Sequence, residues 1–111
     1  MIEMDERVLV DSFVYEEYDG EDRNHNPKYK DGVTVDKVRI DRTNVYSSDS
    51  NQQKIVASSI IFYYVGLSTR VELFKERSRV LLDGGYKTIE KVVKVTQPYS
   101  SDVFSYELEV L

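Results

Sequence analysis

One uncharged run dominates the hydrophobic pattern and predicts the central strand of the fold. Residues 55–65 read IVASSIIFYYV and are bounded by Lys54 and Gly66. β-Branched and aromatic side chains make up most of the run, which favours a pleated strand over a helix. Its first half alternates along the strand, whereas both faces are apolar from Ile60 onward. That pattern is typical of a strand covered on both sides.

The length of the run has a consequence of its own. At 3.3 Å per residue the extended run would span about 36 Å, whereas a domain of this size has a radius of gyration of about 13 Å. We therefore expect the strand to bend or to run past the core. We expect residues 55–61 to be core and residues 62–65 to have surface to spare. One of Tyr63 and Tyr64 then completes the barrel, and the other projects outward toward a neighbouring subunit.

Five further segments show strand-like patterns, which makes about six strands in all. They are residues 8–18, 33–41, 79–82, 86–96 and 104–110. The alternation slips at Asp36 and Lys37, which predicts a β-bulge. Asp83-Gly84-Gly85 predicts a tight hairpin turn, because glycine adopts positive φ at little cost. With almost no helical periodicity, residues 1–111 are predicted to form one all-β domain, a small barrel or sandwich.

Two long polar segments separate these strands. Residues 19–32 are rich in turn-forming residues and predict a long, mobile hairpin connection. Residues 47–53 form a second polar loop without an apolar side chain. Residues 71–77 are interpreted as one helical turn. In the last strand the aromatic and aliphatic residues are expected to face inward, and the residues expected to face outward are Ser105, Glu107 and Glu109.

Composition indicates the class of protein and the compartment in which it is made. The chain has 111 residues, 41% hydrophobic and 32% charged, as in an ordinary soluble protein. It has no cysteine, so no disulfide is expected and a reducing cytoplasm is the natural place of synthesis. The N-terminus lacks the basic and apolar regions of a signal peptide. The apolar run is also much shorter than the roughly 20 residues of a membrane-spanning helix, so we expect no membrane contact.

The net charge of −5 is unevenly distributed. Residues 1–22 hold nine acidic residues and one base, Arg7, whereas residues 23–111 carry a net charge of +3. The simplest interpretation is solvated surface charge. The alternative is an acidic face that meets a basic face on a neighbouring copy. General nucleic-acid binding is disfavoured, because the domain has no overall basic excess.

Candidate catalytic and metal-binding residues are sparse. The only histidine, His25, lies between two asparagines in a turn-rich segment, and without cysteine a zinc site would need distant carboxylates. Asp19, Glu21 and Asp22 resemble the start of a calcium loop, but the twelfth position holds Lys30 instead of glutamate. Turn-forming acids are the better interpretation. No nucleophile has a histidine partner, so we expect no enzyme, metal or cofactor.

Several of these stretches, taken in order along nearly the whole chain, resemble a known family. They are residues 13–18 (FVYEEY) with 22–29 (DRNHNPKY), 33–41 ending in VRID, 57–62, and 78–95 with the closing YELE of 106–109. This order is similar to the small minor capsid protein family of tailed bacteriophages that infect Gram-positive bacteria. Those proteins are related in position and size to the head-completion, or stopper, proteins of long-tailed phages.

The resemblance implies a small β-barrel or sandwich that self-associates into a ring in the virion neck, beneath the portal and adaptor proteins. Such a ring joins the head to the tail-completion protein and helps retain the packaged double-stranded DNA. In stoppers the loop between the second and third core strands faces the central channel. Here that loop is Ser47, Ser48, Asp49, Ser50, Asn51, Gln52 and Gln53. Its weak charge suits a gate better than tight DNA binding, which needs lysine and arginine.

A local basic cluster consists of Arg70, Lys75, Arg77 and Arg79, with Glu72 and Glu76 between them. It adds to the expected contact between subunits. It is either a solvated face or a patch for an acidic neighbour or a phosphate backbone. The residues expected at the subunit interface are Tyr63, Tyr64, Arg70, Lys75, Arg77, Arg79, Glu16 and Glu17. Two alternatives to the stopper stay open. One is a tail-completion protein on the tail side of the joint, and the other is a monomeric β-sandwich that binds a ligand through its loop tips.

Overall fold

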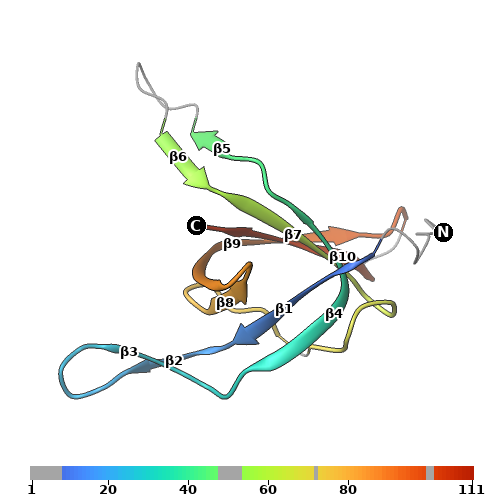
Figure 1. The fold of residues 1–111 in the computed structure, drawn as a ribbon. Helices are drawn as coiled ribbons and strands as arrows, with labels where there is room; N and C mark the ends of the chain where they lie inside the picture. Colours follow the sequence, from blue (N-terminus) through green and yellow to red (C-terminus); the bar gives the residue numbers. More distant parts are fainter. Residues whose placement is uncertain (1–8, 48–53, 72, 100–101) are drawn as a thin grey trace.

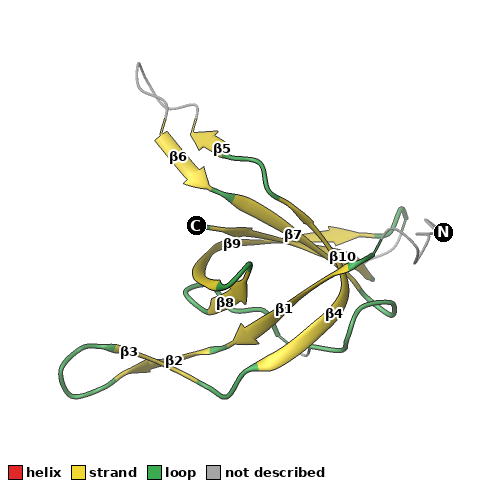
Figure 2. Ribbon diagram, viewed as in Figure 1, coloured by secondary structure: helices red, strands yellow, loops and turns green. Residues whose placement is uncertain are grey.

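The computed structural model describes residues 9–47, 54–71, 73–99 and 102–111. These residues form strands and no helix, so the all-β prediction is confirmed (Figure 2). The strands are β1 Asp11–Glu16, β2 Tyr18–Glu21, β3 Pro27–Tyr29, β4 Val33–Asp41, β5 Val45–Ser47, β6 Lys54–Ala57, β7 Ser59–Tyr64, β8 Arg79–Leu82, β9 Gly85–Thr96 and β10 Val103–Val110.

Six of these strands close into an antiparallel barrel, and the other four form two ribbons that project from it (Figure 1). The barrel order is β1-β4-β7-β10-β9-β8, and it is closed by the pairing of β8 with β1. The two ribbons are β2–β3 and β5–β6. Of the two predicted architectures, the chain therefore adopts the barrel.

Alternating side chains of the six strands fill the barrel. The most buried apolar residues are Val35, Val38, Ile61, Val80, Ile89, Leu108 and Val110. On β10 the predicted alternation holds for its second half. Ser105, which was expected to face outward, is instead 5% exposed and pairs with Tyr64, next to a register shift between β10 and β9 at Val103 and Ser105.

The predicted β-bulge in β4 is confirmed. Asp11 pairs with Val38 whereas Phe13 pairs with Val35, so β4 has one more residue than β1 between these two pairs. Lys37 takes up the extra residue with a φ of 58°. The bulge turns both Val35 and Val38 into the core, which explains why the two halves of the strand alternate in opposite phase.

The long apolar run bends, as its length predicts. It is interrupted at Ser58, whose N–H donates a 2.8 Å hydrogen bond to the carbonyl of Val110. After Ser58 the run continues as β7 in the barrel, and before it β6 leaves the barrel in the β5–β6 ribbon (Figure 1). Ile55 is therefore 40% exposed on the ribbon, and the prediction that it lies in the core is wrong.

Both tyrosines at the end of this run are buried, so the prediction that one of them projects outward is wrong. Tyr63 is 3% exposed, and its hydroxyl accepts a hydrogen bond from the Val71 N–H. Tyr64 is 7% exposed, and its ring packs edge-on against Phe104. The connection after β7 folds back over these rings. The exposed residue here is Val65, at 50%.

Two connections match their predictions to different degrees. Residues 19–32, predicted as a long hairpin connection, form a hairpin that is largely the β2–β3 ribbon. Its turn is capped by Asp22, whose carboxylate accepts the N–H groups of Asn24 and Asn26. These hydrogen bonds hold the pKa of Asp22 below its usual range. The described residues of 71–77 contain no helical turn. Instead they are irregular and insert Phe74 between Tyr15, Tyr63 and Tyr106.

Candidate assembly surfaces

The β5–β6 ribbon projects from the barrel and flanks the predicted channel loop in the sequence. Its strands pair Tyr46 with Ile55 and Ser47 with Lys54, so the far end of the ribbon lies between Ser47 and Lys54. Ser48–Gln53, the rest of the predicted loop, lie outside the described residues. Tyr46 and Ile55 are 52% and 40% exposed, so an apolar cross-strand pair on the ribbon is about half exposed.

A second surface is built around Arg79 at the base of the β2–β3 ribbon. Its guanidinium donates two hydrogen bonds, of 3.0 and 2.8 Å, to one carboxylate oxygen of Glu16. The same group lies 4.2 Å from the ring centres of both Tyr29 and Tyr86. These hydrogen bonds to the Glu16 carboxylate raise the pKa of Arg79 above its usual value. Arg79 thus ties the ribbon to β1, β8 and the start of β9.

Two further cations lie over the neighbouring ring of Tyr18. Lys75 Nζ is 5.6 Å from its centre and donates a hydrogen bond to the Tyr18 carbonyl, and the Arg77 guanidinium is 5.9 Å away. Neither cation forms an ion pair with a described residue. We call this surface the aromatic–cation cluster; its members are Tyr18, Tyr29, Tyr86, Lys75, Arg77 and Arg79, with Glu16 as the partner of Arg79.

The structure therefore gathers half of the predicted interface residues, Glu16, Lys75, Arg77 and Arg79, on one surface. The sequence interpretation missed the three tyrosines that organise them. They come from segments whose pairing is not apparent from local pattern, and the only signal was the high tyrosine content of nine. Tyr63 and Tyr64 are buried elsewhere, and Glu17 and Arg70 line a separate pocket.

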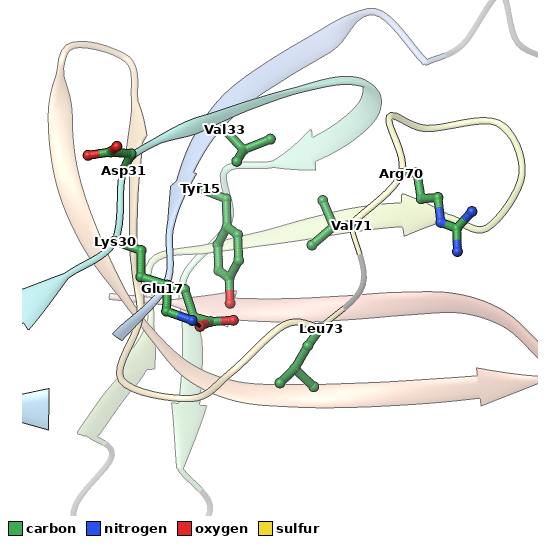
Figure 3. A pocket seen from close by; sticks show the side chains of 8 residues that line it. All are labelled: Tyr15, Glu17, Lys30, Asp31, Val33, Arg70, Val71 and Leu73. Atoms are coloured by element: carbon green, nitrogen blue, oxygen red, sulfur yellow. Dashed lines mark ion pairs between the residues drawn. The ribbon is translucent and has the colours of Figure 1, made fainter. Parts of the chain in front are cut away.

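That pocket opens beside β1 and has a volume of about 440 Å³ (Figure 3). It is lined by Tyr15, Glu17, Lys30, Asp31, Val33, Arg70, Val71 and Leu73. Glu17 and Lys30 form a 2.7 Å ion pair at its wall, which raises the pKa of Lys30. Glu17 therefore faces away from Glu16, as their adjacent positions predict. Figure 3 places Arg70 at the far rim from this ion pair.

The described residues contain neither a candidate metal site nor a membrane-spanning helix. Within the described ranges, no group of three or more candidate ligands could hold a metal ion. His25 Nδ1 lies 3.2 Å from a Glu21 carboxylate oxygen, and the histidine side chain is 88% exposed. The described part of the chain contains no helix long and apolar enough to cross a bilayer.

Comparison with known proteins adds the family. A family model described as "Minor capsid protein" matches residues 5–110 of this chain. A protein of Lactococcus phage LL-H, described as "Uncharacterized protein ORF5", is 32% identical over 88 residues. That match covers 77% of this chain and 73% of the phage protein. No solved structure gave a significant match.

Proposed function

The chain belongs to the minor capsid protein family of phages that infect Gram-positive bacteria, and from this premise we propose that it is a head-completion (stopper) protein. Membership makes it a structural component of a phage virion. In the proposed role, copies of the chain form a ring at the head–tail joint. The ring retains the packaged DNA and offers the tail its docking surface.

The observation that carries this proposal is the pair of ribbons that project from a closed barrel. In the barrel itself every strand has a partner strand on both sides. Each ribbon has only two strands, and an isolated two-stranded ribbon is marginally stable in water. On β5–β6 the apolar pair Tyr46 and Ile55 is also exposed. Such ribbons gain stability when a partner covers them, which fits a subunit of an assembly.

The β5–β6 ribbon is the better candidate for reaching a central channel. Residues 48–53, which connect its strands, contain one acidic residue, Asp49, and no lysine or arginine. Binding to the DNA backbone requires cations that neutralise phosphates. A polar, weakly charged connection instead suits a plug that DNA must pass without adhering to it.

Deletion of Ser48–Gln52 tests the gating role. We expect the purified variant to melt within a few degrees of the wild-type protein, because the deleted residues include no apolar side chain and join a ribbon outside the barrel. In infected cells, heads should fill with DNA and then lose it, or fail to join tails. DNA retention is measured by nuclease protection and electron microscopy.

Replacement of the same five residues by glycine and serine, at unchanged length, is the matched control. A steric plug depends on chain length more than on side-chain identity, so this variant should retain DNA. Normal phage yield from the deletion would contradict the gating role. Cryo-electron microscopy of the neck tests the position of the chain, since density on the tail side of the joint would identify a tail-completion protein instead.

A further inference from the structure

The order of strands in the barrel places two pairs of strands on opposite sides. Along the order β1-β4-β7-β10-β9-β8, the pair β7–β10 is separated from the pair β1–β8 by one strand in each direction, β4 on one side and β9 on the other. In a closed six-stranded barrel the outer surfaces of these two pairs therefore face away from each other. One of them carries Glu16 and Arg79 of the aromatic–cation cluster.

The outer surface of β7–β10 combines apolar side chains with carboxylates. Ile61 and Leu108 point inward and are fully buried, so their strand neighbours point outward. Cross-strand pairing sets Phe62 against Glu107 and Ile60 against Glu109. We call these four residues the acidic seam. All four are half-buried in the isolated chain.

The carboxylates and apolar groups of the acidic seam are only partly satisfied within the described residues, where Lys91 of β9 is the cross-strand neighbour of Glu109. Within the described part of the chain, neither Glu107 nor Glu109 forms an ion pair. Arg39 lies 4.3 Å from the Phe62 ring centre rather than on a carboxylate, and Lys91, opposite Glu109 in the ladder, forms no ion pair with it. The sequence of β7 is apolar on both faces, which is typical of a strand covered on both sides. Within the described residues the inner face of β7 is buried, whereas Ile60 and Phe62 on its outer face are only partly covered.

The aromatic–cation cluster offers the complementary chemistry on the opposite side. Lys75 and Arg77 are exposed cations without an ion pair among the described residues, and Tyr86 beside them is 55% exposed. Tyrosine presents an apolar ring and a hydroxyl, which suits a contact with both isoleucine and glutamate. Cations facing carboxylates also fix the register of such a contact.

We propose that the acidic seam of one copy of this chain docks on the aromatic–cation cluster of the next copy. The proposal rests on the proposed ring and specifies the surfaces that build it. Because the two surfaces differ and face opposite ways, each added copy leaves one of each kind free for the next. Contacts of this head-to-tail type generate rings when the rotation between copies closes.

Charge reversal with rescue tests the pairing. The acidic-seam variant is Glu107→Lys with Glu109→Lys, and the cluster variant is Lys75→Glu with Arg77→Glu. Each should lower the yield of infectious phage by about tenfold or more, because like charges then meet across the contact. The four changes together in one chain should restore the yield, since the charges are complementary again. Thermal melting of each purified variant verifies that it folds.

A disulfide crosslink tests the contact directly. Because the chain has no native cysteine, only the introduced cysteines of this chain can form it. In purified virions that carry Glu107→Cys and Arg77→Cys in the same chain, oxidation should yield a ladder of multimers. Either change alone should yield none. Dimers from Glu107→Cys alone would show a two-fold contact between acidic seams and overturn the proposal. So would charge-reversed variants that remain fully infectious, or a four-change variant no better than its parents.

The outcome is separable from that of the stopper proposal. Rescue by the four changes together with normal DNA retention after the Ser48–Gln52 deletion would keep the subunit contact and reject the gate. DNA leakage after that deletion, with no effect of charge reversal, would keep the gate and reject the contact.

Discussion

At the scale of single residues, the Ser78 hydroxyl connects segments that are far apart in the sequence. This serine is fully buried, and its Oγ accepts a 2.8 Å hydrogen bond from the Tyr18 N–H. It also lies 3.3 Å from the Tyr15 hydroxyl, which accepts a hydrogen bond from the Lys75 N–H. One small polar group thus joins β1, the base of the β2–β3 ribbon and the connection before β8.

Ser78→Ala should therefore destabilise the protein by about 1–3 kcal/mol, the usual cost of a buried donor that loses its partner. Chemical denaturation monitored by tyrosine fluorescence measures the change. Ser12→Ala, at an exposed position of β1, is the control and should change the free energy of unfolding by less than about 0.5 kcal/mol. Equal effects of the two substitutions would contradict the central role of Ser78.

Tyr15 predicts a specific response to alkaline pH. Burial raises the pKa of its hydroxyl above the usual value, so the folded state favours the protonated form. The resulting stability is complete below the unfolded pKa of about 10 and is lost as the pH rises through the folded pKa. The urea midpoint of the wild-type protein should thus fall more steeply above pH 10 than that of Tyr15→Phe. Parallel curves would show that Tyr15 does not titrate in this way.

Ile61 tests the core. Its side chain is fully buried in β7, and an unpaired aspartate there costs several kcal/mol, comparable with a total stability of about 5–15 kcal/mol. Ile61→Asp should abolish the cooperative melting transition in circular dichroism. Val65→Asp, at a 50% exposed position, should still melt cooperatively. A cooperatively melting Ile61→Asp protein would mean that this face of β7 is not core.

At the scale of elements, features set by neighbouring residues were predictable and those set by distant pairing were not. The bulge at Lys37 and the turn at Asp83 and Gly84 depend on neighbouring residues in the sequence, and both occur as predicted. The exposure of Ile55 depends instead on its pairing with β5, and the burial of Tyr64 depends on Phe104 and on the connection after β7. No local pattern encodes these partners.

The β8–β9 turn allows a matched pair of substitutions. Asp83 and Gly84 have φ values of 53° and 79°, as the two-residue hairpin turn requires. Gly84→Ala should cost about 1–2 kcal/mol, because a Cβ disfavours this backbone conformation. Gly85→Ala is the control, since Gly85 does not have positive φ and its Cβ would meet no atom within 4 Å. Equal melting temperatures for the two variants would contradict the strain argument.

Charged side chains support the same turn. Arg42 donates two hydrogen bonds, of 2.7 and 2.9 Å, to the Asp83 carboxylate, which lowers the pKa of that carboxyl group. Both side chains are about half exposed, so this pair contributes less to the stability of the turn than the backbone geometry does. The pair nevertheless links the turn to the end of β4, a contact between residues 41 positions apart.

At the scale of the whole molecule, the chain is more extended than its length suggests. Its radius of gyration is 15.0 Å, compared with about 13 Å for a compact domain of this size. The two ribbons account for the excess, because they project from a barrel that is itself compact (Figure 1). Fold class followed from the sequence. The acidic seam and the aromatic–cation cluster could not be predicted from the sequence, because closure of the barrel brings their residues together.

The position of the last strand in the barrel also determines when the chain can complete its fold during synthesis. β10 comprises Val103–Val110, close to the C-terminus, yet it lies between β7 and β9 and completes both of their ladders. During translation the barrel therefore cannot close until almost the entire chain has left the ribosome. Chains truncated before Val103 should be digested rapidly by protease. They also lack half of the acidic seam, so an interrupted polypeptide would be unable to make the proposed contact with the next copy.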